Sequence, residues 1–411
     1  MWSFETNFWQ ELVDRVKKGV NTERMHEDVT AGTGALSKTA QSVFQTLMTD
    51  GPLSRAELSR RLSLSAAALT KITRPLLAAD LFVEVPSDDD AGAVGRPPQP
   101  LDVNVDFAHF AGVKLTGEAI FLVTTDARGG MLSEREVALR STEPEDVANQ
   151  IAELVAASRA VDRLIVGIGI ALSGNAVRTS PVVRKSPFLR WQDIPFGDLV
   201  ARRTGLPVTL ENDVRAVTAA EQWFGDVPSD SFVMLTFGAG IGCGIVANGQ
   251  QLEGHLGGSG LIGHTRVDDS GPLCYAGHPG CAHAYATIGG LQIRISQAHG
   301  ESLSYEDCLA LHSRHDPAAV AAFNAAGRAI GTLLALVTNM IGPDRVVISG
   351  EGVDIYLRSA DAALARMREL LHWTATEVAI AAKPMQFSEW ARGGAVVAVQ
   401  EHVRGLVANA R

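Results

Sequence analysis

The stretch from Leu235 to Cys281, LTFGAGIGCGIVANGQQLEGHLGGSGLIGHTRVDDSGPLCYAGHPGC, carries most of the information about the fold. Nine glycines fall between Gly238 and Gly260, among β-branched and other apolar residues. Glycine accepts positive φ and lets backbone N–H groups approach ligand oxygens closely. The pattern therefore predicts strands that turn tightly past a ligand.

A candidate metal site follows in the same stretch. His264, Cys274 and Cys281 lie close together in a chain that has only four cysteines. Thiolates and imidazole are ligands that suit zinc, and glycine and proline bend the loop between them. We therefore expect a Zn²⁺ ion to be held by these three residues.

Composition narrows the class of protein. The chain has 411 residues, of which 46% are hydrophobic and 20% charged, as expected for a soluble protein of two or three domains. No long apolar run or basic, apolar leader stands out, so no membrane association is expected. Four cysteines indicate a reducing cytoplasm. The net charge of −10 argues against coating of nucleic acid by the whole surface, but not against one basic module.

The first 100 residues divide into two predicted parts. Apolar residues at helical spacing in residues 1–35 predict a helix followed by a polar linker. That helix is expected to dock on the body or on a second subunit, with a membrane-surface helix as the alternative. Residues 36–100 predict three helices and a strand at Leu81–Val85, with Ser54 and Ser65 as helix caps. This order is that of a winged helix-turn-helix domain.

Basic residues concentrate in that domain. Between Leu53 and Ala79 five basic residues face one acid, Glu57, so the net charge is five minus one, or +4. Such a cluster is typical of phosphate contacts, although a solvated helix face is the alternative. Another arginine follows in Gly95–Pro98, where it would enter a narrow minor groove. The predicted DNA-contacting residues are Arg55, Arg60, Ala66, Ala67, Thr70, Lys71, Arg74 and Arg96.

The remaining chain alternates strands with helices, which predicts an α/β body. We expect strands at 110–115, 119–124, 163–172, 207–210 and 345–349, and helices at 144–160, through 224, around 317–341 and at 393–407. A first lobe is expected over 101–225, completed by the helix at 393–407. A second lobe is expected over 226–392, with the zinc loop inside it.

Two segments resemble the ROK family of bacterial sugar-responsive repressors and sugar kinases. The family motif reads roughly G-E-x-G-H, then C-x-C-G-x-x-G-C-L-E after a spacer, and Gly260–His264 and Cys274–His283 match its frame. The resemblance covers roughly residues 36–407. It implies a two-lobed sugar-kinase/actin-like body with a ligand cleft between the lobes, behind the winged helix-turn-helix.

The resemblance also shows where the kinase machinery is altered. ROK kinases carry D-x-G-x-T on the first strand hairpin, whereas Val113–Glu118 has Lys114 and no aspartate. Phosphoryl transfer needs a carboxylate for Mg²⁺ and amides for the phosphates, so no catalytic residue is expected. Asp213 occupies the position of the kinase base. It is expected to accept a hydrogen bond from a sugar hydroxyl, with helix capping as the alternative.

The predicted ligand site departs from the family too. Leu261 and His283 replace two sugar-binding glutamates, and Phe188 replaces an asparagine. A buried hydroxyl left unpaired costs roughly 1–3 kcal/mol, so a less hydroxylated or anionic ligand is expected, such as a sugar phosphate or sugar acid. Loss of the small-molecule response is the alternative. The resemblance implies effector contacts at Ser186, Asn212, Asp213, His264 and His283.

The resemblance places one further metal ligand at a position that is Ala276 here. Three family ligands remain, and His278, His283 or water is left to supply the fourth.

Together these features predict a cytoplasmic transcriptional regulator, most simply a repressor, that binds operator DNA as a homodimer or homotetramer. A small sugar-like or sugar-phosphate effector would close the cleft and change the separation of two DNA-binding heads. Two alternatives stay open. One is a sugar kinase with an appended DNA-binding module, and the other is a regulator controlled by a protein partner.

Overall fold

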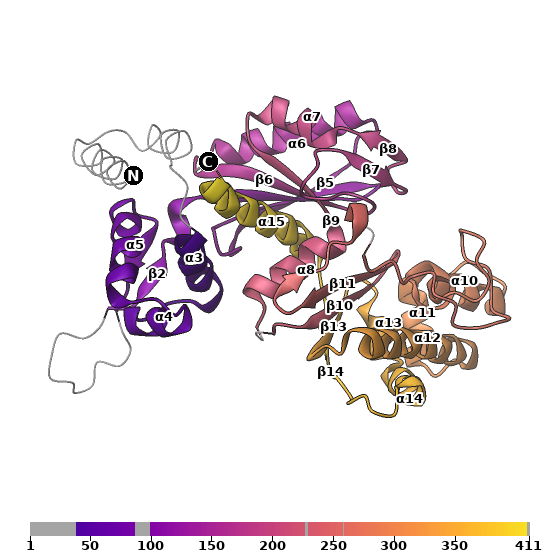
Figure 1. Ribbon diagram of the computed structural model, residues 1–411. Helices are drawn as coiled ribbons and strands as arrows, with labels where there is room; N and C mark the ends of the chain where they lie inside the picture. The colour runs from indigo at the N-terminus through magenta and orange to yellow at the C-terminus, as the bar shows by residue number, and fades with distance from the viewer. Residues whose placement is uncertain (1–37, 87–98, 227–228, 258, 409–411) are drawn as a thin grey trace.

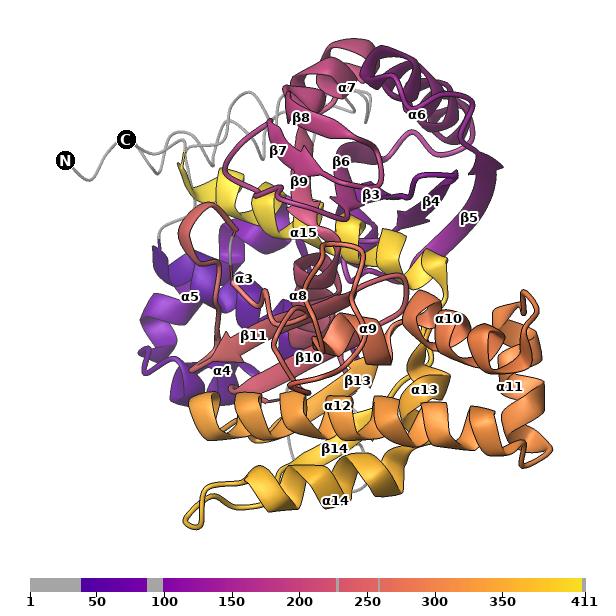
Figure 2. The ribbon, with the colours of Figure 1, turned by 90° about the vertical axis from the view of Figure 1, so that its right-hand side faces the viewer.

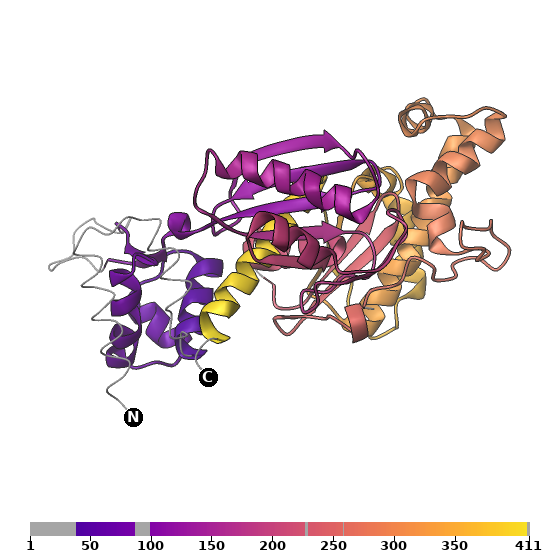
Figure 3. The ribbon, with the colours of Figure 1, turned by 90° about the horizontal axis from the view of Figure 1, so that it is seen from above.

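The computed structural model describes residues 38–86, 99–226, 229–257 and 259–408. Three parts are visible in Figure 1: a small helical domain near the N-terminus and two lobes built on sheets. In the view from above, the helical domain and the helices of the second lobe lie at opposite ends (Figure 3). The predicted N-terminal helix and linker over 1–35, and Arg96, lie outside the described residues.

The N-terminal part is a helix-turn-helix with a two-stranded wing. It contains α3 (Lys38–Asp50), α4 (Arg55–Arg61), α5 (Ala66–Ala78), β1 (Phe82–Glu84) and β2 (Leu101–Val103). β1 and β2 pair antiparallel, and Leu53 bridges Leu101. The predicted fold class is confirmed. Through the pairing of β1 with β2, residues Leu101–Val103 form the second strand of the wing.

The first lobe is a five-stranded mixed sheet with the strand order β5-β4-β3-β6-β9. β4 pairs antiparallel with both β3 and β5, whereas β6 pairs parallel with both β3 and β9. Helices α6 and α7 pack on one face of this sheet, and β7 and β8 form a separate hairpin. The bounds are η1 (Val105–Phe107), β3 (His109–Leu115), β4 (Ala119–Thr125), β5 (Met131–Ala138), α6 (Pro144–Arg159), β6 (Ile165–Leu172), β7 (Val183–Ser186), β8 (Trp191–Ile194), α7 (Phe196–Thr204) and β9 (Val208–Asn212).

The second lobe repeats this plan with the order β12-β11-β10-β13-β14. Its helices lie mostly on the face away from the first lobe, as Figure 2 shows. Helix α8 (Asp213–Phe224) follows directly from β9 and completes the first lobe. The bounds in the second lobe are β10 (Phe232–Phe237), β11 (Ile241–Ala247), β12 (Gln250–Gln251), η2 (His255–Gly257), α9 (Ala282–Ala286), α10 (Ile288–His299), α11 (Tyr305–Ser313), α12 (Pro317–Ile341), β13 (Arg345–Ser349), α13 (Val353–Leu357), α14 (Ala360–Leu370) and β14 (Ala379–Ala382).

Helix α12 is long and apolar enough to cross a membrane by length and composition alone. Two-thirds of its most apolar window, 67%, is buried inside the protein, against the β10 and β13 side of the second-lobe sheet. Burial of this extent is what the core helix of a globular domain shows.

The last helix, α15 (Phe387–Ala408), ties the three parts together. It lies on the first-lobe sheet, where a Cβ on Gly169 would come within 1.8 Å of the carbonyl oxygen of Gly394. Glycine at this crossing lets the helix backbone approach the strands closely. Farther along, Val399 and Val403 share a buried cluster with Phe44 of α3. The winged helix-turn-helix domain is therefore packed onto the end of α15, as Figure 1 shows.

Candidate functional site

The helix-turn-helix is built by local sequence signals. The Ser54 hydroxyl accepts a hydrogen bond from the Glu57 amide and caps α4, and the Ser65 hydroxyl accepts one from the Ala68 amide and caps α5. Leu69, Thr73 and Leu76 turn the inner face of α5 into the domain core. The opposite face is thereby fixed as the solvent-facing one.

The predicted DNA contacts of α5 all lie on that outer face. Ala66, Ala67, Thr70, Lys71 and Arg74 are exposed there. The front of this helix carries small side chains and its middle carries two cations, an arrangement that lets a helix enter a groove between phosphates.

The two predicted contacts on α4 differ from each other. Arg60 is exposed, whereas Arg55 forms an ion pair with Glu84 of the wing, at 2.6 Å. Arg55 also donates to the carbonyl oxygen of Gln99, at 3.4 Å. In this conformation the Arg55 guanidinium braces the wing against α4.

Lys114 and Asp213 form an ion pair between β3 and the start of α8. Both side chains are buried, at 5% and 6% exposed, and the lysine Nζ donates to Asp213 Oδ2. The ammonium also lies 5.0 Å from the ring centroid of Trp390 on α15. The Val214 amide donates to Asp213 Oδ1, at 2.9 Å. The Asp213 carboxylate is thus engaged at both oxygens.

The glycine-rich turn after β10 is occupied by a carboxylate. The Ala239 amide donates to Glu351 Oε1, at 2.8 Å, and a Cβ on Gly238 would come within 1.9 Å of that same oxygen. Glycine at position 238 is needed for this approach. The Glu351 carboxylate takes the place that an anionic group, such as a phosphate, would take against such an amide.

Two of the predicted effector residues use their side chains to hold backbone. The Ser186 hydroxyl donates to the carbonyl oxygen of Ser173, at 2.8 Å. Asn212 donates to the carbonyl oxygen of Gly174, at 3.0 Å, and accepts from the Arg215 amide, at 3.2 Å. In this conformation Ser186 and Asn212 shape the loops beside Asp213.

The predicted metal ligands come together at one point. The Nδ1 atom of His264 lies 3.5 Å from the Sγ of Cys274 and 3.7 Å from the Sγ of Cys281. One ligand atom each from His264, Cys274, His278 and Cys281 lies within 4.8 Å of the others. Zinc bonds of about 2.0–2.3 Å in a tetrahedral site place neighbouring ligand atoms roughly 3.5 Å apart, so this donor set fits zinc.

The fourth residue of the cluster is His278, one of the three candidates left open by the sequence. His283 lies outside the cluster, with its ring stacked on the ring of His264 at 5.3 Å between centroids and 5° between planes. Burial lowers the pKa of His283, and burial followed by the charge of His278 lowers the pKa of His264. Both rings therefore favour the neutral form, in which an imidazole can bind a metal.

The two cysteines of the cluster differ. Burial acts to raise the pKa of Cys274, but backbone hydrogen bonds from His278 and Ala276 outweigh it, and its pKa is lowered. Burial raises the pKa of Cys281. Elsewhere in the chain, burial raises the pKa of Cys243 to about 12.

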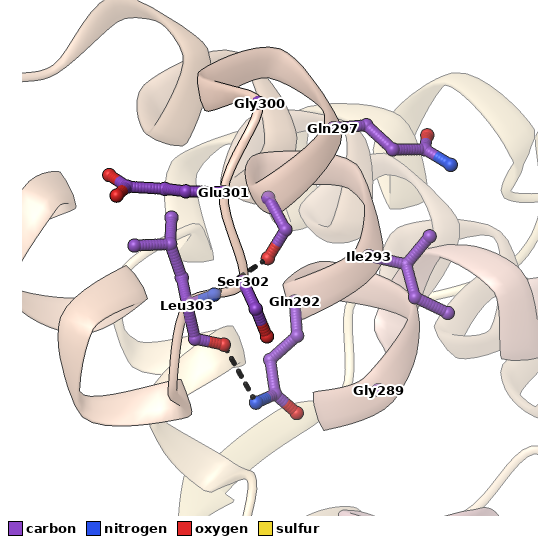
Figure 4. A pocket seen from close by; sticks show the side chains of 9 residues that line it. Gly289, Gln292, Ile293, Gln297, Gly300, Glu301, Ser302 and Leu303 are labelled. Carbon is purple, nitrogen blue, oxygen red and sulfur yellow. Dashed lines mark hydrogen bonds between the residues drawn. The ribbon is translucent and has the colours of Figure 1, made fainter.

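One cavity of about 580 Å³ lies away from all of these residues. It runs along α10 and the loop that follows, and Figure 4 shows Gln292 and Leu303 at its rim. Gln292 donates to the carbonyl oxygen of Leu303, at 3.3 Å. The predicted effector residues do not line this cavity.

Sequence reasoning missed the ion pair of Asp213, the carboxylate at Ala239 and a buried cluster of Arg178, Glu211 and Arg215. In that cluster both arginines pair with Glu211, and the three side chains are 1–3% exposed. The spacing of Glu211 and Arg215, four apart at the start of a helix, is a signal that could have been used. Nothing in the local sequence points Arg178 toward Glu211.

Comparison with known proteins places this geometry in context. A model of the ROK family matches residues 110–388. The DNA-binding transcriptional repressor Mlc of Escherichia coli (strain K12) is 29% identical over 326 residues, which cover 75% of this chain and 80% of that protein.

Solved structures agree. A ROK family transcriptional regulator, a homolog of the Escherichia coli Mlc protein, superposes with a TM-score of 0.77 at 26% identity, over 89% of this chain and 96% of that one. A ROK family glucokinase from Streptomyces griseus, in complex with glucose and AMPPNP, gives 0.61 at 26% identity, over 71% of this chain and 100% of that one. The body is thus shared with kinases, and the likeness to the regulator also extends beyond the body.

Proposed function

The chain belongs to the ROK family, and from that membership we propose that it is a cytoplasmic transcriptional regulator, most simply a repressor, that binds operator DNA. The observation that carries this proposal is the exposed face of α5, which joins small residues at its front to Lys71 and Arg74. Small residues allow close approach to base edges, and cations contact the flanking phosphates.

The full proposed DNA surface is the outer face of α5 together with Arg60, Arg96 and Arg55. Arg60 and the α5 cations bind phosphates, and Arg96 enters the minor groove. Arg55 contributes by holding the wing through Glu84. Two such surfaces in a homodimer or homotetramer read the two halves of an operator.

We propose that the body is not an enzyme. Lys114 occupies the position where family kinases carry an aspartate, and it neutralises Asp213, the residue at the position of the kinase base. Glu351 accepts the hydrogen bond of the Ala239 amide in the glycine-rich turn. The negative charge of Glu351 would repel a nucleotide phosphate at this point. Lys114 thus stands where phosphoryl transfer needs a carboxylate for Mg²⁺, and Glu351 stands where it needs a free amide for phosphate.

The effector is proposed to be a small sugar-like molecule or sugar phosphate that binds between the lobes. His264 and His283 are proposed to contact the effector, while Ser186 and Asn212 position the loops beside Asp213. An anionic group on the effector would compete with Asp213 for Lys114 and free the Asp213 carboxylate for a hydroxyl. Binding would then shift the population of lobe arrangements and with it the spacing of the DNA-binding domains.

We propose that Zn²⁺ is held by His264, Cys274, His278 and Cys281. When bound, the ion would cross-link the loop between His264 and Cys281 and hold His264 in place. His278 then replaces the family ligand that is missing at Ala276. A metal bond to one ring nitrogen would fix the orientation of His264 and leave its second ring nitrogen free to contact the effector.

The proposed function is tested by selecting fragments of the source genome on purified protein at low salt, and by assaying ATP turnover with sugars. We expect enrichment of a small set of promoter fragments and no sugar-dependent ATP hydrolysis. Hydrolysis that Asp213→Asn abolishes would favour a kinase with an appended DNA-binding module. Fragments bound only when lysate is added would favour control by a protein partner.

A further inference from the structure

Arg178 lies where the two lobes and the last helix meet. It follows β6 in the first lobe, and its side chain is 3% exposed. Its guanidinium donates to Glu211 Oε2 of β9 at 2.9 Å, to Gln400 Oε1 of α15 at 2.8 Å, and to Gln251 Oε1 of β12 at 3.2 Å. One planar group thus bonds to the first lobe, the second lobe and the helix that carries the DNA-binding domain.

The second lobe is held at this point by more than one bond. Gln251 also donates to the carbonyl oxygen of Arg215, at 2.8 Å, and Arg215 donates to the carbonyl oxygen of Glu253, at 3.0 Å. Arg215 pairs with Glu211 as well, at 2.9 Å. Movement of the segment 251–253 therefore disturbs the partners of Arg178 directly.

Helix α15 continues from Gln400 into the core of the DNA-binding domain. Two residues later, the ring of His402 lies 6.1 Å from the ring of Phe107 and 5.4 Å from that of Phe110. Phe107 in turn meets Phe44 of α3 edge-on, at 5.8 Å. A shift or rotation of this end of α15 must repack the base of the DNA-binding domain, because close-packed side chains do not deform continuously.

Arg178 lies close to one further carboxylate of the second lobe and to one of α15. Its Nε lies 3.8 Å from Glu253 Oε1 of the second lobe, and its Nη1 lies 3.9 Å from Glu401 Oε1 of α15. A buried guanidinium that loses one partner must find another, because an unpaired buried charge is costly. Separation of the lobes would therefore break the bond of Arg178 to Gln251 and favour a closer pairing with Glu401 of α15. Approach of the lobes would restore the bond to Gln251.

We infer that Arg178 is the positioning residue that couples the relative position of the two lobes to the orientation of the DNA-binding domain, through Gln251 on one side and Gln400 on the other. This inference rests on the proposed function, since it supplies the route by which an effector between the lobes alters DNA binding. It concerns an internal coupling that exists with or without DNA and effector.

The test uses hydrogen exchange of the full-length chain, with neither DNA nor effector present. Gln251→Met removes the second-lobe partner of Arg178, and the side-chain bonds of Gln251 go to Arg178 and to the carbonyl oxygen of Arg215. We expect exchange in α3 to rise about threefold or more. In the background of Gln400→Met or Arg178→Met, adding Gln251→Met should change α3 exchange no further, since the route is already broken.

Controls separate coupling from unfolding. Arg184→Met removes an arginine whose pairing with Asp193 is exposed, and it should leave α3 unchanged. Exchange in the core helix α12 should stay slow in every variant. The inference is overturned if Gln251→Met speeds exchange only around residues 211–215 and leaves α3 as in the wild type, or if its effect on α3 adds fully to that of Gln400→Met. Because no DNA is used, either outcome leaves the DNA-binding proposal to be judged separately.

Discussion

At the scale of single residues, the proposal that this body is not a kinase depends most on Lys114 and its partner Asp213. Lys114 and Asp213 are both buried and pair with each other. Removal of the lysine alone would leave a buried carboxylate without its counter-charge. Lys114→Met should therefore lower the free energy of unfolding by about 3–5 kcal/mol in urea titrations.

The double variant Lys114→Met/Asp213→Asn should regain most of that loss, because no unpaired charge remains. If the single variant is as stable as the wild type, the pair is not the buried contact described above.

A second residue-scale prediction concerns pH. The Ala319 amide, followed by His299, lowers the pKa of Asp316, the cap of α12. A lowered carboxyl pKa stabilises the fold above the unfolded pKa of about 4, and this stabilisation is lost as the pH falls through the folded pKa. The stability difference between wild type and Asp316→Asn should therefore be present near about pH 5 and disappear by about pH 2. A difference that persists unchanged at the acidic end would contradict the assignment.

At the scale of elements, Arg128 joins the first lobe to the winged helix-turn-helix domain. From the turn after β4 it donates to the carbonyl oxygens of Leu47 at 2.5 Å and Met48 at 3.3 Å, and to Asp102 Oδ2 of β2 at 2.9 Å. These bonds cap the C-terminal end of α3 and hold the wing.

Arg128→Met should loosen this junction by about 2–3 kcal/mol, because several charge-assisted bonds are lost and Asp102 is left buried. Hydrogen exchange should rise in α3 and β2 and stay unchanged in β10. Arg135→Met, which alters an exposed arginine of the same lobe, is the matched control. Equal effects of the two variants would show that Arg128 is not a clamp.

The metal loop is the second element with a direct test. Treatment with a strong chelator should release about one zinc ion per chain, and Cys274 and Cys281 should then react with iodoacetamide at about pH 8. Cys243 should stay unreactive, because it is buried and its pKa is about 12. The protein for this test is made in zinc-supplied cells. If it releases no metal, and all thiols are equally reactive before and after chelation, the proposed metal site is wrong.

Elements with local signals could be predicted from the sequence. Helix α5 begins at Ala66 as predicted, because Ser65 caps it, and β13 spans the predicted Arg345–Ser349. The exposed strand β5 was not predicted, since its sequence MLSEREVA lacks a buried face, and its pairing with β4 decides its structure. In the candidate site, too, residues close in sequence could be predicted to lie together, whereas contacts between distant residues could not. The four-residue metal cluster lies in one short stretch, whereas the partner of Lys114 is 99 positions away and Arg178 meets residues of three elements. Such contacts are set by tertiary packing, which a single sequence does not display.

At the scale of the whole molecule, a kinase-like body and a winged helix-turn-helix domain are packed into one unit. The shared core of α3 and α15, rather than a loose tether, connects them. In the proposed coupling, movements of the lobes would reorient the winged domain through this shared core. The proposed function therefore depends first on whether the exposed face of α5 binds DNA.

The measurement that tests this requirement most directly is the salt dependence of binding to a selected promoter fragment, for the wild type, Lys71→Ala and Lys185→Ala. Lys71 is exposed on α5, and Lys185 is an exposed lysine of the first lobe. We predict that Lys71→Ala binds more weakly, with the slope of log affinity against log salt reduced by about one, and that Lys185→Ala behaves as the wild type. Unchanged affinity and slope for Lys71→Ala, or the same loss in Lys185→Ala, would contradict the account.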